Sequence, residues 1–411
     1  MMHASNGTSG WREFSGHKLL VLSAFLGLTT SMNAIMIYSL GSFIGPFNAE
    51  FGWNRGDISF AVSVLTFAVF LFGPVVGQLC DRFGAATVGS LSLLSYGLAV
   101  IAMTFLVQSL FGLWLAFFII AMLGVGSTPI VLLRPITAGF DKRRGLALGI
   151  ALTGAGLAGF WAPNLTTEVV ASYGWRAGYW TLGALAICAA PVVWFGFGPS
   201  ERRATISAPA KGSSEGLTFT DARRTSSFWL ASTLAITMAL GVGGMVVHLI
   251  PLFQDLGAGA KTAARLASLL GIASAIGRLV IGLCLDRFPA QLVAITVLLM
   301  GAAGLALLGV GGLSFVLVAV ILIGLLLGAE LDLLAYMASR LFGQKAFGAI
   351  YGWLYAMYAI GFGISPYAIG RLYDSFGSYD YALVGSIMCL AVAALTVIGL
   401  RPPSPRPAIT A

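Results

Sequence analysis

The sequence contains little charge for its length. Only 9% of its 411 residues are Asp, Glu, Lys or Arg, whereas an average soluble domain has about 25%. A soluble fold of this size needs charged residues over its whole surface to remain dispersed, so this composition excludes a soluble globular protein. Hydrophobic residues make up 58% of the chain, and the mean hydropathy is +0.93. The lipid bilayer is the solvent that suits such a chain.

Residues that carry enzymatic chemistry are also scarce. The chain has three histidines and four cysteines, and each cysteine lies in or at the end of an apolar run, without metal-ligand spacing: Cys80, Cys188, Cys284 and Cys389. We interpret them as small apolar core residues. No nucleophile–base pair, phosphate-binding loop or metal cluster is recognisable. We therefore expect no enzyme, no cofactor and no metal.

The net charge of +8 does not indicate a nucleic-acid partner, because the basic residues are dispersed in short loops and form no patch. The first 17 residues are polar, and the apolar run that begins at Leu19 is too long for a cleavable signal peptide. The expected partners are the lipid bilayer and a small molecule, and the chain is expected to act as a monomer.

Apolar stretches dominate the chain, and each is long enough to cross about 30 Å of hydrocarbon. We predict an all-α membrane protein with twelve transmembrane helices: 18–47, 57–79, 86–107, 110–138, 145–171, 176–197, 227–255, 263–285, 290–310, 313–341, 346–372 and 379–400. The polar stretch 198–226 predicts a linker between two bundles. The predicted domains are an N-terminal segment, two six-helix bundles joined by the linker, and a tail: 1–17, 18–197, 198–226, 227–400 and 401–411.

The distribution of basic residues indicates the orientation. With a cytoplasmic N-terminus, sixteen of the 23 Lys and Arg residues fall in cytoplasmic segments and five in the outer loops. Cytoplasmic loops are enriched in Lys and Arg, so both termini are expected on the cytoplasmic side of the inner (plasma) membrane.

The two predicted bundles share an internal repeat. The pattern G-x-x-x-D-R-F occurs at 77–83 after the second span and at 282–288 after the eighth. A weaker pair, Gly145–Gly149 and Gly348–Gly352, opens the fifth and eleventh spans at nearly the same offset. Duplicated six-helix halves are typical of transporters that bind substrate between the halves, near the bilayer midplane.

The repeated G-x-x-x-D-R-F loops resemble a signature of the major facilitator superfamily, although the basic pair that usually follows it is absent. The segments 51–55 (FGWNR), 141–149 (DKRRGLALG) and 366–374 (PYAIGRLYD) resemble monocarboxylate transporters, and the first of these is also similar to the oxalate–formate antiporter-like proteins. The resemblance implies a major facilitator fold of two pseudo-symmetric six-helix bundles and a transporter of small carboxylates.

A charge at bilayer depth costs at least ~2.5–3.5 kcal/mol on insertion scales, so Arg278 inside the eighth span needs a reason. We predict that its guanidinium binds a substrate carboxylate through two hydrogen bonds; the alternative is an ion pair with a neighbouring helix. The resemblance supports substrate binding, since the monocarboxylate family places its anion-binding arginine in a similar context. That family has an aspartate one turn earlier, where this chain has Ser274.

Glu330 and Asp332 lie in the tenth span and are candidate proton-coupling residues. An acid in apolar surroundings can bind and release a proton near neutral pH, which suits a reversible proton carrier. Residues i and i+2 point about 200° apart on a helix, so we expect only one of them to face a central cavity squarely. The alternative is that both simply balance Arg278 and Arg340.

Further polar residues are candidates for the substrate site. Tyr351, Tyr355 and Tyr358 follow a single face of the eleventh span, where they either pack or form an aromatic wall with hydroxyl tips. Asn33 in the first span and His248 in the seventh are additional candidates, and the alternative for His248 is an ordinary hydrogen-bonded histidine.

Gating residues are expected at the helix ends. In the superfamily, the aspartate of the repeated loop caps a neighbouring helix, which implies conformational roles for Asp81, Arg82, Asp286 and Arg287; the alternative is a plain turn. Arg134, near the inner end of the fourth span, is expected to snorkel or to form a gating salt bridge, with a second anion contact as the alternative.

Together these features predict a secondary active transporter that moves a small organic monocarboxylate with protons by alternating access. Two other transport functions remain open: proton-independent exchange of carboxylates, and export of a hydrophobic drug-like compound. A non-transporting sensor is a further class, but the short tail after Arg401 offers no signalling domain.

Overall fold

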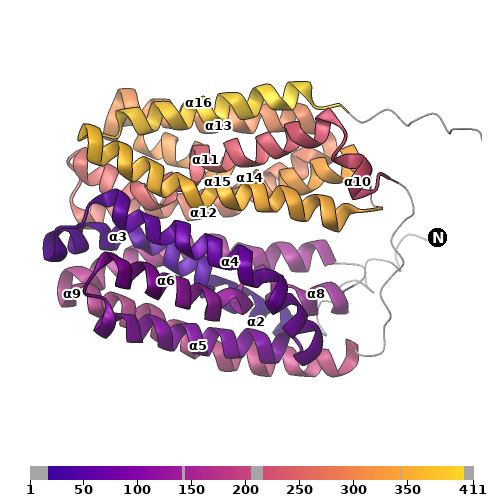
Figure 1. Cartoon of the computed structure of the whole chain (residues 1–411), viewed down its shortest axis with the longest axis horizontal. Coiled ribbons are helices and arrows are strands. Elements are labelled where there is room, and N and C mark those ends of the chain that lie inside the picture. Colours follow the sequence, from indigo (N-terminus) through magenta and orange to yellow (C-terminus); the bar gives the residue numbers. More distant parts are fainter. Residues whose placement is uncertain (1–16, 141–143, 205–215, 344, 402–411) are drawn as a thin grey trace, which may run out of the picture.

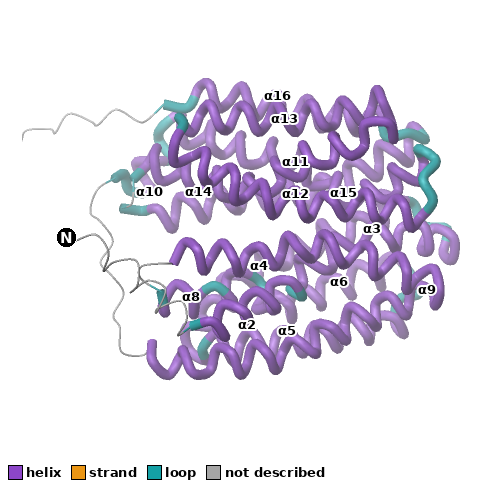
Figure 2. The backbone as a smooth tube through the Cα atoms, turned by 180° about the vertical axis from the view of Figure 1, so that it is seen from behind, coloured by secondary structure: helices purple, strands orange, loops and turns teal. Residues whose placement is uncertain are grey.

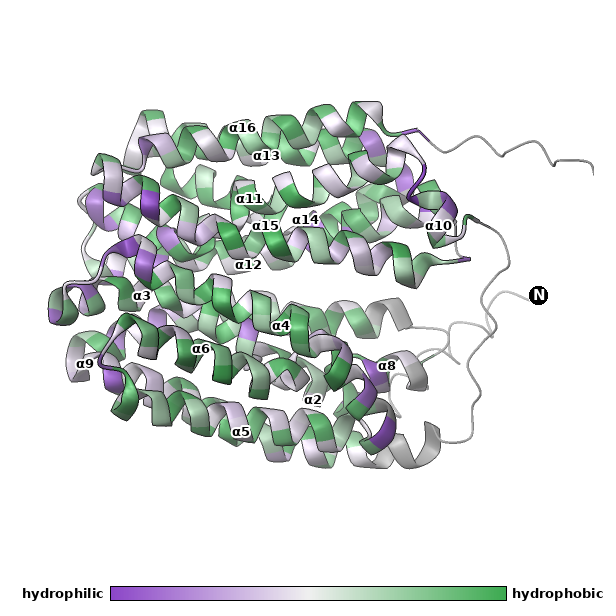
Figure 3. Cartoon of the chain, viewed as in Figure 1, coloured by the Kyte–Doolittle hydropathy of each residue, from purple (hydrophilic) through white to green (hydrophobic). Residues whose placement is uncertain are grey.

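The computed structural model describes residues 17–140, 144–204, 216–343 and 345–401, which are almost entirely helical. The first half of the chain forms helices whose apolar residues run along their length (Figure 3). They are α2 (Lys18–Thr29), α3 (Met32–Phe51), α4 (Arg55–Phe83), α5 (Ala85–Leu106), α6 (Leu110–Gly124), η1 (Val125–Ser127), α7 (Pro129–Leu132), α8 (Arg134–Gly139) and α9 (Arg144–Ala204).

The second half repeats this pattern after a short helix that follows the linker. Its elements are α10 (Phe219–Ala222), α11 (Ser226–Asp255), α12 (Ala260–Arg287), α13 (Ala290–Gly311), η2 (Gly312–Phe315), α14 (Val316–Phe342), α15 (Phe347–Phe376) and α16 (Asp380–Gly399). Hydrophilic residues gather toward the two ends of the bundle, as expected for helices that cross a membrane (Figure 3).

Nine stretches among the described residues are long and apolar enough to cross a membrane. Two of these are long enough to contain two spans each. Ala147–Gly198 turns at Gly174, which has φ 83°, and Ala290–Phe342 turns at Gly312, which has φ 52°. A left-handed backbone favours glycine, so these positions divide the stretches into the pairs of spans that the sequence predicts. With α15 as a further 30-residue helix, every predicted span corresponds to helical structure.

The two halves of the chain form two layers, with α2–α9 in one and α11–α16 in the other (Figures 1 and 2). Within each layer the helices pack on their own half, for example α5 on α9 and α11 on α15. Three helix pairs join the layers: α4 with α15, α9 with α12, and α3 with α11. We call the end that holds Lys18 and Gly399 the terminal end, and the end where α3 and α15 finish the far end.

Glycines allow the two layers to approach closely. Gly271 on α12 lies against the backbone of Gly159 on α9, and Gly370 on α15 lies against Gly56 on α4. Helix pairs within a membrane associate through small residues, because lipid gives them no hydrophobic driving force and close backbone contact supplies the attraction. These two contacts, one on the α9–α12 pair and one on the α4–α15 pair, are therefore places where the backbones of the two halves touch.

Two helices of the first half are interrupted. The first span breaks at Thr30 and Ser31, and the fourth changes to a 3-10 turn and an extended residue at Thr128. The breaks lie side by side, because the Ser127 hydroxyl accepts a hydrogen bond from the Met32 N–H at 3.0 Å. Irregular backbone at membrane depth is stable only where it is buried in protein or lines a cavity. These breaks accordingly mark an interior region of the first half.

The predicted linker differs slightly from the structure at both ends. Helix α9 continues to Ala204, past the predicted boundary at 197. Gly198 and Pro199 suggest an end there, but residues 201–204 (ERRA) are all strong helix formers. At the other end of the linker, the Leu217 N–H donates to the Phe342 carbonyl oxygen at 2.9 Å. The last residues of the linker are thus attached to the end of α14.

The contact between Gly271 and Gly159 makes a testable prediction. A Cβ at Gly271 would lie 2.5 Å from the carbonyl carbon of Gly159, a backbone atom that cannot move aside cheaply. We expect Gly271→Ala to cost about 1–3 kcal/mol, as overpacking does, and to lower the melting temperature of the purified protein. Gly282→Ala on the same helix is the control, because nothing lies within 4 Å of its added Cβ; an equal effect of both changes would contradict the prediction.

Candidate functional site

Helices α12 and α14 pack unusually closely around the predicted anion site. A Cβ at Gly277 would lie 2.6 Å from the Leu325 carbonyl oxygen, and one at Gly328 would overlap the Ser274 carbonyl oxygen. These contacts are between backbones, so neither helix can shift without losing them. The close packing brings the side chains of Arg278 on α12 and Asp332 on α14 to the same level.

Arg278 forms an ion pair with Asp332. Its Nε lies 3.3 Å from the Asp332 Oδ2 and 3.4 Å from the Gly328 carbonyl oxygen. Both distances exceed the usual value of about 2.9–3.0 Å for an N–H···O hydrogen bond. Among the described residues, the two terminal nitrogens of the guanidinium have no hydrogen-bond partner, and 22% of the Arg278 side chain is exposed. The fork of the guanidinium is therefore available to a further anion.

Glu330 lies two residues before Asp332 on α14, in a different environment. Its side chain is completely buried, and its Oε2 accepts a hydrogen bond from the Tyr358 hydroxyl at 2.7 Å. Its Oε1 is buried without a hydrogen-bond partner in the described part of the chain. The two acids thus have different neighbours. Asp332 contacts the Arg278 guanidinium, and Glu330 contacts the Tyr358 hydroxyl. This agrees with side chains at positions i and i+2 of a helix pointing in different directions.

The tyrosines of α15 face this group of charges. The rings of Tyr351, Tyr355 and Tyr358 follow one another with centroids 6.4 Å apart. Tyr351 lies within electrostatic range of Arg278, as Tyr358 does of Glu330. Two members of the row thus lie near ionisable residues, and both the packing role and the role in a substrate site stay predictions.

Tyr38 on α3 completes the group from the other half of the molecule. It lies against Ser274 and within electrostatic range of Arg278 and Glu330, and its ring packs on Gly159. We call Tyr38, Arg278, Glu330, Asp332 and the three α15 tyrosines the central cluster. Because Tyr38 belongs to one half and the other members to the second, the central cluster lies between the layers.

Asn33 follows the break in the first span. Its Oδ1 is buried and has no hydrogen-bond partner among the described residues, although the side chain as a whole is partly exposed. Met32 beside it is tied to Ser127, so the position of Asn33 depends on the paired breaks of the first and fourth spans.

A second polar group joins the halves at the far end. The Arg55 guanidinium on α4 donates two hydrogen bonds to Asp255 on α11, each 2.9 Å long. It also donates to the Tyr379 hydroxyl at 3.0 Å and lies over the Tyr373 ring, 3.9 Å from the centroid. Two parallel bonds from one guanidinium to one carboxylate form the strongest common ion-pair geometry.

Asp374 caps the first turn of α4 from the opposite half. Its Oδ1 accepts from the Arg55 N–H at 3.1 Å, and its Oδ2 accepts from the Gly56 N–H at 2.9 Å. A helix begins with four amide groups that have no partner within the helix, and a carboxylate there is also stabilised by the helix dipole. Opening the far end thus requires α4 to lose its cap.

His248 lies at this end and not in the central cluster. It is completely buried, and its Nε2 lies 3.1 Å from the Ser59 hydroxyl and 2.9 Å from the Pro366 carbonyl oxygen. Its Nδ1 lies 3.0 Å from the Tyr379 hydroxyl. These partners belong to α4, α15 and the residue before α16, so His248 connects the two halves.

The predicted gating residues are spread over the terminal end. Arg82 lies over the Phe83 ring, Arg287 lines a pocket, and Arg134 begins α8 in a partly buried position with interactions of its own. The side chains of Asp81 and Asp286 lie outside the described residues, so their predicted roles stay predictions.

The sequence analysis missed several residues that the structure brings together. Arg55 and Asp374 appeared there only within motifs and Tyr379 only as the start of a predicted span, while Asp255 and Tyr38 were not considered. A signal for Tyr38 is that it is the one tyrosine of the predicted span 18–47. The partners of Arg55 gave no such signal, because they lie 200 and 319 residues away.

The cap at the far end makes a second prediction. Asp374→Ala removes the partner of the Arg55 and Gly56 amides, and a hydrogen bond to a charged group is worth about 1.5–3 kcal/mol. We expect amide exchange in the peptide around residues 54–58 to accelerate at least about tenfold. Asp380→Ala is the matched control, since the Asp380 side chain is exposed and its hydrogen bond in the described part of the chain comes from its neighbour Ser378. Unchanged exchange in Asp374→Ala would show that the cap does not hold the far end.

Comparisons with known proteins agree with this architecture. The family model of the Major Facilitator Superfamily matches residues 26–366 and 250–411. The chain is 29% identical to bovine monocarboxylate transporter 13 over 291 residues, which are 69% of this chain and 63% of that relative. It is also 22% identical over 340 residues to the uncharacterized MFS-type transporter YhjX of Escherichia coli, covering 79% of this chain and 81% of that one.

Solved structures show the same fold at low identity. A bacterial homologue of the human lysosomal transporter Spinster, in an inward-facing and occupied conformation, aligns with a TM-score of 0.69 and 17% identity over 94% of this chain and 97% of that one. A mutant of the nucleoside transporter NupG aligns with a TM-score of 0.74 and 13% identity over 93% and 99%. The chain, a multi-pass membrane protein, belongs to the Major Facilitator Superfamily of transporters.

Proposed function

We propose that this transporter moves a small organic monocarboxylate together with protons by alternating access. The observation that carries the proposal is the guanidinium of Arg278, which lies inside the membrane-spanning region between the halves and leaves its terminal nitrogens without protein partners among the described residues. The similarity to monocarboxylate transporter 13 supports the same substrate class.

Substrate binding follows from the loose ion pair of Arg278. A substrate carboxylate takes the free fork of the guanidinium through two hydrogen bonds, which are stronger than the single long contact to Asp332. The tyrosines of α15 and Tyr38 then surround the remainder of the substrate with apolar ring faces and hydroxyl tips. Asn33 and His248 are also proposed to contribute to substrate binding. Asn33 offers an oxygen that has no partner among the described residues. His248 acts indirectly, because it joins the two halves at the far end.

Proton coupling follows from the charge balance of the central cluster. Without substrate, Arg278 and Asp332 neutralise each other. An arriving carboxylate adds one negative charge, and an unbalanced charge in a buried site costs several kcal/mol. One proton taken up with the substrate, by Asp332 or by a Glu330 that is ionised beforehand, leaves the net charge of the cluster unchanged, so substrate and proton enter together. Glu330 is suited to keep that proton from water, since it is completely buried and bonded to Tyr358.

Alternating access uses the two ends of the molecule in turn. In this structure the far end is joined by Arg55, Asp255 and Asp374. With both termini in the cytoplasm, as the basic residues indicate, the joined end is the outer one. We therefore propose that this is an inward-facing state of a plasma-membrane protein, as the conformation named for the Spinster homologue is. The gating arginines Arg82, Arg134 and Arg287 lie at the terminal end and are proposed to act when that end closes.

The first test addresses the anion site. Carboxylates such as lactate, pyruvate and benzoate are expected to raise the melting temperature of the purified protein, and Arg278→Ala is expected to abolish the rise. Truncating one partner of a hydrogen-bonded charge pair costs about 2–5 kcal/mol of binding energy, at least a thirtyfold loss of affinity. Arg265→Ala, which removes an exposed arginine at the far end, is the control. Equal stabilisation of the Arg278→Ala variant would remove Arg278 from the site.

The second test addresses the proton. In liposomes, Glu330→Gln is expected to abolish accumulation driven by a pH gradient and to leave carboxylate exchange intact, because Gln cannot carry a proton but keeps a hydrogen bond to Tyr358. Asp380→Asn serves as the control. Unchanged proton dependence in Glu330→Gln, with Asp332→Asn equally unaffected, would remove both acids as proton carriers. Transport by the wild type that does not respond to a pH gradient would favour carboxylate exchange without protons.

A further inference from the structure

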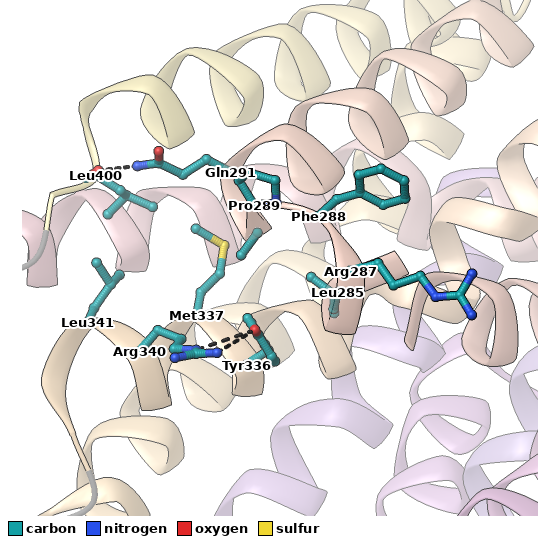
Figure 4. A pocket seen from close by; sticks show the side chains of 11 residues that line it. Leu285, Arg287, Phe288, Pro289, Gln291, Tyr336, Met337, Arg340, Leu341 and Leu400 are labelled. Atoms are coloured by element: carbon teal, nitrogen blue, oxygen red, sulfur yellow. Dashed lines mark hydrogen bonds between the residues drawn. The ribbon is translucent and has the colours of Figure 1, made fainter. Parts of the chain in front are cut away.

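A pocket of about 400 Å³ lies at the terminal end of the second half, away from the central cluster. It is formed where α12, α14 and α16 end and α13 begins (Figure 4). Its lining combines two arginines, a tyrosine and a glutamine with apolar residues: Leu285, Arg287, Phe288, Pro289, Ala290, Gln291, Tyr336, Met337, Arg340, Leu341 and Leu400. This volume falls within the roughly 300–1,000 Å³ of small-ligand pockets.

The charge of the pocket is positive. Its described lining contains Arg287 and Arg340 and no carboxylate. The Arg340 Nε and Nη2 donate to the Tyr336 hydroxyl at 3.3 and 3.1 Å, and this tyrosine is the partner that orients the guanidinium. The Arg287 guanidinium points away from that of Arg340 (Figure 4), so the two do not grip one group jointly. Arg340 is the direct anion contact, and Arg287 adds to the positive potential around it.

The rest of the pocket is apolar and lies where the candidate spanning helices end, the level at which such helices pass from hydrocarbon to headgroups. Leu341 and Met337 precede the end of α14, and Leu400 follows the end of α16. Phe288, directly after α12, is 54% exposed, as expected for an aromatic residue in the interfacial region. A ligand that fits must therefore present a negative group to Arg340 and an apolar part to Phe288 and Leu341.

We propose that this pocket binds the headgroup of an anionic phospholipid from the surrounding leaflet. The phosphate lies against Arg340 and the Tyr336 hydroxyl, and the glycerol and upper acyl segments lie along the apolar lining. Basic pockets between the ends of transmembrane helices are a general mode of recognition for anionic lipids. The proposal is independent of the carboxylate substrate.

The site has a consequence for the central cluster. Arg340 lies eight residues beyond Asp332 on α14, and Arg287 lies nine residues beyond Arg278 on α12, which corresponds to about 12–14 Å along each helix. A lipid in the pocket contacts the ends of the same two helices whose packing sets the Arg278–Asp332 distance. Anionic lipid is therefore expected to stabilise the arrangement of α12 and α14.

Native mass spectrometry of the purified full chain tests the proposal with equal amounts of dioleoyl phosphatidylglycerol and dioleoyl phosphatidylcholine. We expect the wild type to retain phosphatidylglycerol preferentially. Arg340→Ala should reduce that preference about fivefold, since each basic residue near an anionic membrane surface contributes on the order of 1 kcal/mol. Tyr336→Phe should cause a smaller loss, because it frees Arg340 and keeps the ring. Arg265→Ala removes the same charge from the far end and should change nothing.

Three results would overturn the proposal. Equal retention of the two lipids by the wild type would show that headgroup charge is not recognised. An equal loss in Arg340→Ala and Arg265→Ala would assign the preference to overall charge and not to the pocket. Displacement of phosphatidylglycerol by the same concentration of inorganic phosphate would identify a site for free phosphate. A folding check by melting temperature accompanies each variant, and Arg340→Lys, which keeps the charge, is expected to recover part of the preference.

Discussion

The cost of a charge inside a membrane governs the arrangement of the second half. Arg278 lies on a helix whose neighbouring residues are apolar, and an unpaired guanidinium there is expensive. The close packing of α12 on α14 through Gly277 and Gly328 brings Asp332 to within 3.3 Å of it. The ion pair is nevertheless long and involves only the Nε atom of the guanidinium. Asp332 therefore balances the charge of Arg278 and leaves its two terminal nitrogens without a partner among the described residues. A site of this kind is stable when empty and still has hydrogen-bond donors to offer an anion.

Glycine serves two different purposes in this molecule. On α12 and α14 it fixes two helices within one half, so that the geometry of the charged residues is held by backbone contacts. At Gly271 with Gly159, and at Gly370 with Gly56, it lets one half touch the other with little side-chain interlocking. In both places the contacts lie against backbone atoms, so glycine sets how closely two helices approach within a half and where the two halves touch.

The far end combines separate interactions into a single junction. Arg55 and the amides of its own helix turn bind two different acids of the other half, Asp255 and Asp374, and His248 joins the same helices from within the protein. Arg55, Asp255 and Asp374 keep these hydrogen bonds only while the two halves are in contact at the far end, so the bonds depend on one another. The central cluster lies at the same interface, and its Tyr38 comes from the half opposite to Arg278. The contacts at the far end and the shape of the central cluster thus both depend on how the two halves are placed against each other.

Local sequence features predict the class of the fold and the positions of its unusual charges. Apolar stretches of membrane-spanning length, the repeat of G-x-x-x-D-R-F and the isolated Arg278, Glu330 and Asp332 are visible in short segments, and the thickness of the bilayer makes the apolar stretches helices. The packed structure was needed to pair Arg278 with Asp332, to bring Tyr38 into the central cluster and to place His248 at the far end. These contacts join helices dozens to hundreds of residues apart. Their partners depend on how closely glycine lets two helices pack, and the pattern of hydrophobic residues does not encode that distance.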